Sequence, residues 1–302
     1  MRRLAARSIP LLLTTLIAAC VAGPGATGTT PAPTDGPSAP PSASPSPSTT
    51  LPADADTLLL QVRFEGGFVA PDYRFSAMPT ASLYADARLI APGPQIEIYP
   101  GPLLPSVLVT RLPVVAVERL LDSARAAGLA SGSDAAYPPH GIADAPNTVF
   151  VVWTPEGVTT TSFGALGMDQ QDVPAAEQAA RAAASAFATR LADPAILDGA
   201  TSSAYMPRAA RIIVRDYSAA PDPQLTQRPV AWPFATPLAT FGAPVVAGSP
   251  EAGRCGVVDG TDLTTLWPVL GDANALTPFT SGGREYQLVV RPLLPHEAAT
   301  CD

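Results

Sequence analysis

Residues 21–53 form a tract that cannot contribute to a packed core. They are almost entirely Pro, Ser, Thr, Gly and Ala, contain no aromatic residue and carry one charged side chain, Asp35. Such a segment buries too little apolar surface to offset the entropy lost on ordering, so we expect it to be extended and disordered. At the rise of polyproline II it spans up to about 100 Å. A folded body is therefore expected from the 249 residues 54–302, which suffice for one large or two modest domains.

The residues before this tract have the pattern of a secretion signal. Three arginines precede an apolar run, 9–19, that is too short to span a bilayer comfortably. The run ends in Leu16-Ile17-Ala18-Ala19-Cys20, which resembles the lipobox of bacterial lipoproteins. The resemblance implies cleavage after residue 19, diacylation of the Cys20 thiol and a lipid anchor outside the cytoplasm. An ordinary signal with an incidental cysteine is the alternative. Arg2-Arg3 also hints at twin-arginine export, but the flanking residues match that route poorly and favour general secretion.

The chain has three cysteines, Cys20, Cys255 and Cys301. If lipid occupies the first, an oxidising compartment allows the other two a single intramolecular bridge. Such a bridge would pin a chain end that normally frays. Two unpaired buried thiols are the alternative. We predict a Cys255–Cys301 disulfide.

The charge balance is acidic. All 18 basic residues are arginine, and 26 residues are Asp or Glu. Removal of residues 1–19 takes away three arginines, which leaves 15 and a net charge near −11. The sequence shows no arginine cluster able to follow a phosphate backbone, so nucleic acid is not expected as a partner. Anionic lipid weakly repels an acidic body, which leaves the acyl chains as the membrane contact. No later segment has 18 uninterrupted apolar residues, so no transmembrane helix is predicted.

Residues 54–200 alternate between strand and helix patterns. One helix is indicated by apolar residues at helical spacing from Val114 to Ala124, with Gly128 as its C-cap. Another begins after Pro174 and has an alanine-rich face. The predicted elements are a strand at 58–64, a hairpin at 82–90, a helix at 114–124, a hairpin at 148–163 and a helix at 174–191. This order favours an antiparallel sheet covered on one face.

Residues 201–302 form a second predicted subdomain. Its expected elements are strands at 211–215, 254–258 and 286–290 and a short helix at 261–270. Between them, 221–250 is so rich in proline that it excludes regular helix and central strand. The predicted class is α+β, with antiparallel sheets, helices on one face and a proline-rich coil in the C-terminal half. The predicted organisation is a signal peptide at 1–19, lipidated cysteine and linker at 20–53, an α+β subdomain at 54–200 and a C-terminal subdomain at 201–302.

Several short runs after the linker resemble one group of uncharacterised bacterial lipoproteins. The likeness covers most of the chain after the linker and rests on Gly66-Gly67-Phe68, Leu83-Tyr84-Ala85-Asp86, Tyr99-Pro100-Gly101-Pro102, Ala143-Asp144-Ala145-Pro146 and Arg291-Pro292-Leu293-Leu294-Pro295. Members of the group carry glycine at the position of Ala87, so a tight hairpin turn is less expected here. The group has no assigned activity. The resemblance therefore implies a fold and a lipid-anchored location outside the cytoplasm, but it implies no catalytic residue.

The chain has two histidines, His140 and His296. His140 lies close in sequence to Asp144, which is compatible with a Ser-His-Asp hydrolase. However, the Gly-x-Ser-x-Gly signature of a nucleophile elbow is absent, and a solvated loop position explains each histidine more simply. We therefore predict no catalytic residue. An envelope hydrolase centred on His140 and Asp144 is the alternative function.

The sequence contains no convincing motif for a metal or cofactor site. Two distant histidines and thiols claimed by lipid or a bridge make an unfavourable zinc site. Asp169 and Asp172 lack the spacing of an EF-hand, and a helix N-cap explains Asp172 better. No Gly-x-Gly-x-x-Gly or Walker pattern occurs. We expect no cofactor and no metal.

The aromatic residues of the second half are the remaining candidates for a binding surface. Trp232, Phe234, Phe241 and Trp267 lie near prolines and would suit a groove for a peptide, glycan or lipid. Packing of these rings in a core poor in regular sheet is the simpler alternative. The expected function is that of a non-catalytic, lipid-anchored cell-envelope protein, held at the membrane by its lipid, that binds a protein, peptide or glycan.

Overall fold

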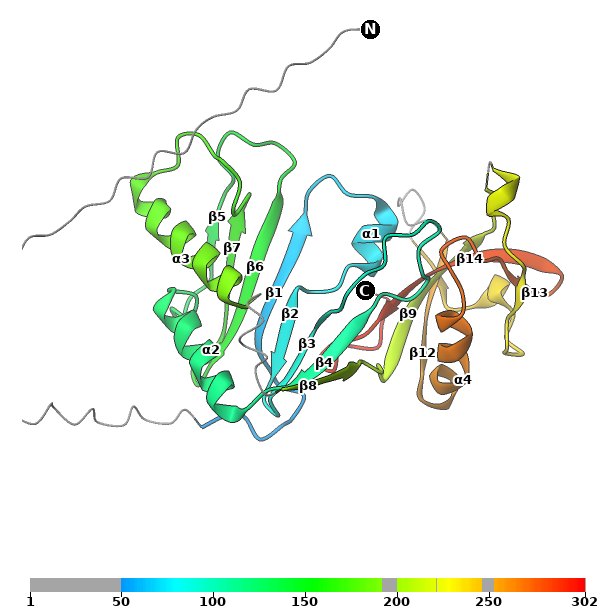
Figure 1. Cartoon of the computed structure of the whole chain (residues 1–302), viewed down its shortest axis with the longest axis horizontal. Coiled ribbons are helices and arrows are strands. Elements are labelled where there is room, and N and C mark those ends of the chain that lie inside the picture. Colours follow the sequence, from blue (N-terminus) through cyan, green and yellow to red (C-terminus); the bar gives the residue numbers. More distant parts are fainter. Residues whose placement is uncertain (1–49, 192–199, 221, 246–252, 302) are drawn as a thin grey trace, which may run out of the picture. The chain divides into compact units, whose positions relative to one another are not determined.

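The strands of this chain form two sheets (Figure 1). The computed structural model describes residues 50–191, 200–220, 222–245 and 253–301. Within those ranges the predicted α+β class is confirmed, with two mixed, mostly antiparallel sheets and four α-helices. The predicted signal peptide, Cys20 and nearly all of the linker lie outside the described residues. In the described part, no helix is both long and apolar enough to span a membrane.

The first sheet has eight described strands in the order β5-β7-β6-β1-β2-β3-β4-β8. All neighbours are antiparallel except β5 and β7. The predicted strand at 58–64 is the centre of this sheet, and both predicted hairpins are confirmed. The strands are β1 (Leu58–Gly66), β2 (Ala81–Tyr84), β3 (Arg88–Pro92), β4 (Val107–Arg111), β5 (Ala135–Tyr137), β6 (Pro146–Thr154), β7 (Gly157–Gly164) and β8 (Thr201–Ala204).

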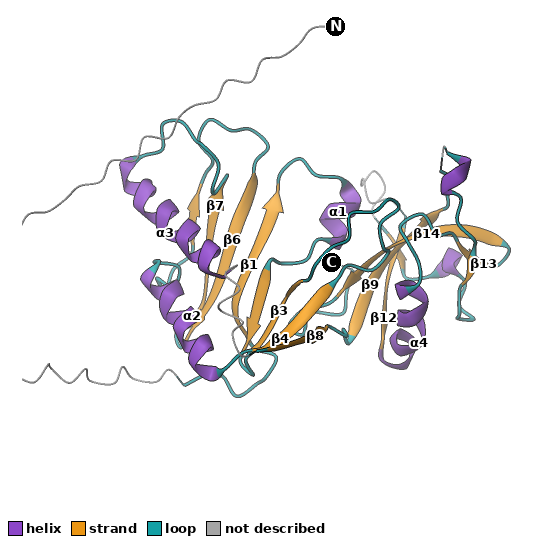
Figure 2. Cartoon of the chain, in the orientation of Figure 1, coloured by secondary structure: helices purple, strands orange, loops and turns teal. Residues whose placement is uncertain are grey.

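Helices α2 (Val114–Ala126) and α3 (Ala175–Leu191) pack on this sheet (Figure 2). Of the residues at helical spacing in α2, Val117, Leu121 and Ala124 are buried in the core of the first sheet, as an amphipathic helix requires, whereas Val114 in the first turn is exposed. The helix ends at Ala126, and its C-cap is Ala127. Gly128 follows with a φ of 75°, and the Leu129 N–H donates to the Ala124 carbonyl. Gly128 thus terminates the helix as predicted, one position after the cap residue.

The turn between β2 and β3 forms although this chain has alanine there. Ala87 has a φ of 67°, and its N–H donates to the Tyr84 carbonyl at 2.9 Å. Left-handed backbone is strained for a residue with a Cβ. The cross-strand pairing on either side, including Leu83 with Leu89, holds the turn in place without glycine.

The second sheet has six described strands in the order β10-β13-β14-β9-β12-β11. Helix α4 (Gly260–Gly271) packs on it. The proline-dense segment contributes, in its described part, only two-residue edge strands and short 3-10 turns, which is where proline is tolerated. The strands are β9 (Ala209–Asp216), β10 (Val230–Ala231), β11 (Ala243–Pro244), β12 (Arg254–Asp259), β13 (Phe279–Ser281) and β14 (Arg284–Pro292), and the 3-10 turns are Pro223–Leu225 and Leu238–Thr240.

The two sheets are joined through residues that follow β8 and β14. Thr201–Ala204 pairs with β4, so the strand just past residue 200 belongs to the first sheet. Tyr205 is buried and its hydroxyl donates to the Leu293 carbonyl at 2.8 Å. Leu294 packs in the same small core as Tyr84. All described residues belong to one compact unit.

The predicted disulfide is present. Cys255 on β12 is bonded to Cys301, with an S–S distance of 2.01 Å and a Cα–Cα distance of 6.0 Å, both normal for a bridge. The bond fastens the end of the chain to an inner strand of the second sheet.

Candidate functional site

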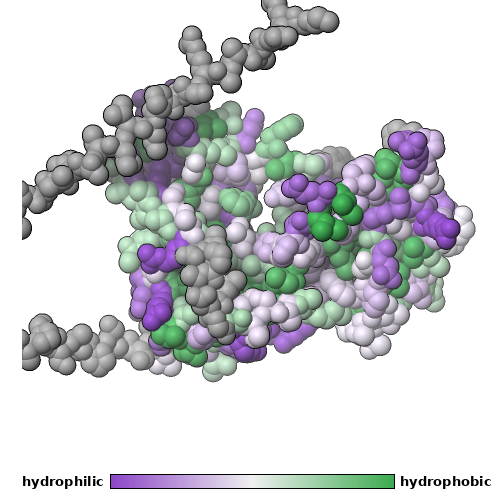
Figure 3. Space-filling model, in the orientation of Figure 1, coloured by the Kyte–Doolittle hydropathy of each residue, from purple (hydrophilic) through white to green (hydrophobic). Residues whose placement is uncertain are grey.

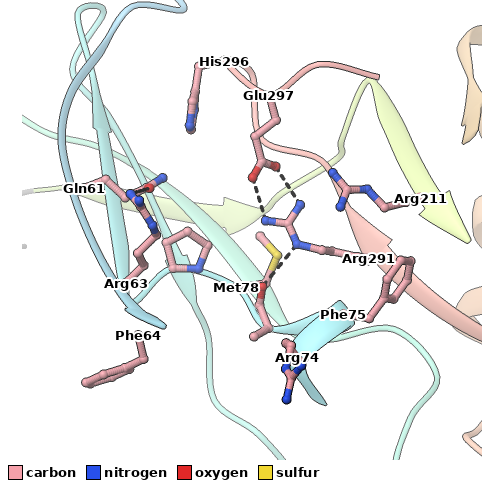
Figure 4. A pocket seen from close by; sticks show the side chains of 12 residues that line it. Gln61, Arg63, Phe64, Arg74, Phe75, Met78, Arg211, Arg291, His296 and Glu297 are labelled. Carbon is pink, nitrogen blue, oxygen red and sulfur yellow. Dashed lines mark hydrogen bonds and ion pairs between the residues drawn. The ribbon is translucent and has the colours of Figure 1, made fainter. Parts of the chain in front are cut away.

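Apolar and hydrophilic residues are interspersed over the face of the molecule that Figure 3 draws, so hydropathy alone does not single out a binding surface on that face. The cavities are more informative. One, of about 420 Å³, is lined from both sheets and collects arginines from four separate elements (Figure 4). Arg63 comes from β1, Arg74 from the short helix α1 (Pro71–Ser76), Arg211 from β9 and Arg291 from β14. Below, this cavity is called the arginine pocket.

Strand alternation explains why β9 and β14 direct arginines to the pocket. Ile212 and Val290 belong to the core shared with α4, so Arg211 and Arg291, each one residue away, lie on the opposite face. The register pairs Arg291 directly with Arg211. Like charges opposite each other on antiparallel strands are destabilising. The pairing of two arginines is therefore locally unfavourable, and such exceptions are common at functional positions.

Arg291 is held in place by a carboxylate. Its Nη1 and Nη2 donate to Glu297 at 2.8 and 2.7 Å, and its Nε donates to the Ala77 carbonyl at 3.2 Å. Glu297 also accepts the Leu294 N–H at 2.7 Å. Burial acts to raise the pKa of Glu297, but the hydrogen bonds and charge of Arg291 outweigh it and hold that pKa below its usual value. The pair is thus ionised at neutral pH.

His296 is oriented by a buried tyrosine. Its Nδ1 lies 2.8 Å from the Tyr84 hydroxyl. Burial raises the pKa of Tyr84, so its hydroxyl stays protonated at neutral pH. Burial also lowers the pKa of His296; the carboxylate of Glu297 opposes this shift, and Arg291 adds to it. The imidazole is therefore neutral at pH 7.

Arg63 and Arg211 have further contacts next to the pocket. Arg63 donates to Glu65 at 2.7 Å and to the side-chain oxygen of Gln61 at 3.0 Å. The Arg211 guanidinium carbon lies 6.0 Å from the centre of the Phe75 ring of α1, within cation–π range. Helix α1 is itself tied to β9 through the Asp72–Arg215 ion pair.

The pocket is positive although the chain is acidic. Four arginines line it against one carboxylate, Glu297, in a protein of net charge −8. Walls of low dielectric focus such a field into the cavity. Strand register and the docking of α1 bring together arginines that are spread from position 63 to position 291 in the sequence. His296, for which a solvated loop position was predicted, also lines the pocket.

The structure places the predicted aromatic candidates in or against the second core. Trp232 is 7% exposed and Phe241 9% exposed. Phe234 and Trp267 are partly buried and pack against the same cluster. This placement favours the alternative in which the rings stabilise the fold, because a ring that is already buried has little surface left for a partner.

His140 is bonded to a different carboxylate from the one the sequence suggested. Its Nε2 lies 3.0 Å from the Glu177 carboxylate of α3, and its backbone N–H donates to the side-chain oxygen of Gln170 at 2.9 Å. Asp144 has a φ of 56°, and its carbonyl accepts the Phe68 N–H. Glu177 and Gln170 thus explain His140 as a contact that joins a loop to a helix. Glu177 was missed because it lies 37 residues away.

The described residues contain no group of three His, Cys, Asp or Glu side chains placed to hold a metal ion. Asp172 does not cap α3, which corrects the N-cap prediction. The helix begins at Ala175, and the Pro174 carbonyl accepts its first bonds. Asp172 instead lies in the preceding turn with a φ of 56°.

Comparison of the chain with protein-family models, with curated proteins and with solved structures finds no match in any of the three.

Proposed function

We propose that this protein is a non-catalytic, lipid-anchored protein of the cell envelope that binds an anionic ligand in the arginine pocket. The observation that carries the proposal is the convergence of Arg63, Arg74, Arg211 and Arg291 on one cavity of about 420 Å³. This volume is within the usual range for small-molecule sites. Glu297 and Glu65 pair with two of these arginines, and the excess of arginine over carboxylate around the cavity favours a negatively charged ligand.

The groups around the pocket favour an acceptor-rich anion. A guanidinium has five N–H donors and no acceptor, and its planar fork fits carboxylate and phosphate oxygens. The neutral imidazole of His296 also lines the cavity. Arg291 is held on one side by Glu297, and Arg74 and Arg211 line the same cavity. Carboxylate and phosphate are the matching groups.

The proposed location, outside the cytoplasm and anchored by lipid, rests on observations that are independent of the pocket. The Cys255–Cys301 disulfide is consistent with an oxidising, extracytoplasmic compartment. The lipobox-like run ending in Cys20 and the Pro-rich linker after it favour a body tethered to a membrane by lipid. The resemblance to uncharacterised bacterial lipoproteins supports the same location.

Loss of one pocket arginine is expected to weaken anion binding. Arg211→Gln removes one charge and a charge-assisted hydrogen bond, worth about 1.5–3 kcal/mol, so we expect methyl phosphate to bind at least about tenfold more weakly. Calorimetric titration measures this change. Arg284→Gln is the matched control, because it makes the same charge change on an exposed side chain that pairs with Asp216. Equal affinity of the two variants would contradict an anion site in this pocket.

Replacement of Cys20 is expected to abolish lipid attachment. The thiol itself receives the diacylglycerol, so Cys20→Ser leaves no acceptor. Metabolic labelling with a fatty-acid analogue in the producing bacterium measures the attachment. Cys255→Ser should stay fully labelled, since it changes a thiol that the disulfide occupies. Undiminished label on Cys20→Ser would overturn the proposed lipid anchor.

A further inference from the structure

A second cavity, of about 500 Å³, borders the arginine pocket and has the opposite chemistry. It lies on the helix-covered face of the first sheet, between the end of α3 and strands β1 to β3. Leu89, Leu166, Ala188 and Leu191 are among its lining residues, and no charged side chain of the described residues lines it. Its other lining residues are apolar, small or carry a hydroxyl. This apolar groove suits a hydrocarbon chain.

Phe64 is common to both cavities. Its side chain is 57% exposed, and in Figure 4 its ring is directed away from the arginines. Consecutive residues of β1, and of the segment that enters β2, line alternate cavities. Arg63 and Pro79 line the arginine pocket, whereas Val62 and Thr80 line the groove. The two cavities therefore border each other where β1 and the segment before β2 run past one another.

The sheet is open at this point. Pairing of β1 with β2 ends at Val62 and Ala81, whereas β1 continues to Gly66 with β6 as its partner. Beyond Val62, no strand of the described residues covers this side of β1. A ligand can pass the open edge at Phe64 with one end on each face of the sheet.

We infer that the ligand is an amphiphilic anion, whose phosphate or carboxylate head binds in the arginine pocket and whose hydrocarbon chain lies in the groove. This inference rests on the proposed anion site and adds the ligand class. Charge complementarity selects the head, and the neutral, apolar groove next to it selects a chain rather than a second charged group. An exposed aromatic ring between them gives the first methylene groups an apolar surface.

Three probes and three α3 variants test this inference. Methyl phosphate carries the head alone, dodecyl phosphate carries head and chain, and dodecyl maltoside carries the chain with a neutral head. Each is titrated below its micelle concentration. Burial of about four methylene groups already suffices for a hundredfold gain, so we expect dodecyl phosphate to bind at least about a hundredfold more tightly than methyl phosphate. Ala188→Trp fills the groove and should remove this gain while methyl phosphate still binds.

Control variants separate filling of the groove from damage to the fold. Ala179→Trp adds the same ring at an exposed position of α3 outside the groove and should keep the gain. If Ala188→Trp does not fold, Thr189→Trp fills the groove from an exposed lining position. Persistence of the full gain in whichever groove variant folds would overturn the inference.

The remaining outcomes are distinct. Equal affinity for methyl phosphate and dodecyl phosphate would overturn the inference that the ligand is amphiphilic. The proposed anion site would then remain supported. Dodecyl maltoside binding as tightly as dodecyl phosphate would also overturn the inference, because the head would then have no part in recognition. Failure of both phosphates to bind would overturn the proposed function itself. Loss of dodecyl phosphate binding in Arg211→Gln, with the groove intact, would support both proposals.

Discussion

Arg291→Ala is expected to lower the free energy of unfolding by about 3–5 kcal/mol at pH 7, because it leaves the buried carboxylate of Glu297 without its partner. Arg291 and Glu297 have side chains only 10% and 20% exposed, so water cannot replace the guanidinium fully. The Ala77 carbonyl also loses its donor. Chemical denaturation at pH 7 measures the loss.

The loss should depend on pH with a defined sign. In the wild type the pKa of Glu297 lies below its usual value, so the stability that the carboxylate contributes is present above the unfolded pKa and disappears as the pH falls through the folded pKa. In Arg291→Ala, burial acts without the guanidinium and raises the pKa of the carboxyl. The carboxyl then takes up a proton as the pH falls and escapes the cost of a buried charge. The difference between wild type and variant is therefore largest at pH 7 and narrows toward pH 4.

A double variant separates the unpaired charge from the loss of the arginine itself. Arg291→Met with Glu297→Gln removes both charges and keeps an oxygen that accepts the Leu294 N–H. Replacement of a buried ion pair by neutral groups of similar volume is often close to neutral, so most of the lost stability should return. An equal loss in the single and double variants would show that packing of the arginine, rather than the charge of Glu297, determines the effect.

Local sequence signals predicted the elements that depend on neighbouring residues. Helix α2 follows from the spacing of Val117, Leu121 and Ala124 and from its termination at Gly128. The β6–β7 hairpin follows from two β-branched runs around a short turn. In both cases the residues that decide the structure lie within one turn of helix or one hairpin of each other, so the sequence pattern contains the information.

The arginine pocket could not be predicted in this way. Its chemistry depends on the register that sets Arg291 opposite Arg211 and on the docking of α1, a helix too short to show a periodic pattern. The only local signals were single arginines within the apolar runs of β9 and β14. A single charged residue in a strand is normally read as facing solvent. Only the pairing of the strands reveals that two such residues share one cavity wall with Glu297.

Trp232→Ala is expected to lower the free energy of unfolding by about 3–5 kcal/mol, the usual effect of removing a large buried aromatic ring. Trp232 is 7% exposed, and its ring centre lies 5.1 Å from that of Phe234 and 5.6 Å from that of Phe241, both edge-on. Its Nε1 donates to the Thr236 carbonyl at 3.0 Å. Had this ring been a contact for a partner, the same change would have left the melting temperature nearly unchanged.

The packing around Phe241 explains why the site cannot collapse to fill the space left by Trp232. A Cβ added at Gly256 would come within 2.4 Å of the Phe241 ring, so that ring already lies directly on the backbone of β12 and has little freedom to move. Trp232→Phe keeps most of the volume and loses only the bond to Thr236, so we expect it to cost about 1–2 kcal/mol. Thermal and chemical melts of the two variants measure the difference. A Trp232→Ala protein as stable as the wild type would show that the ring does not support this core, and would return Trp232 to the candidates for partner binding.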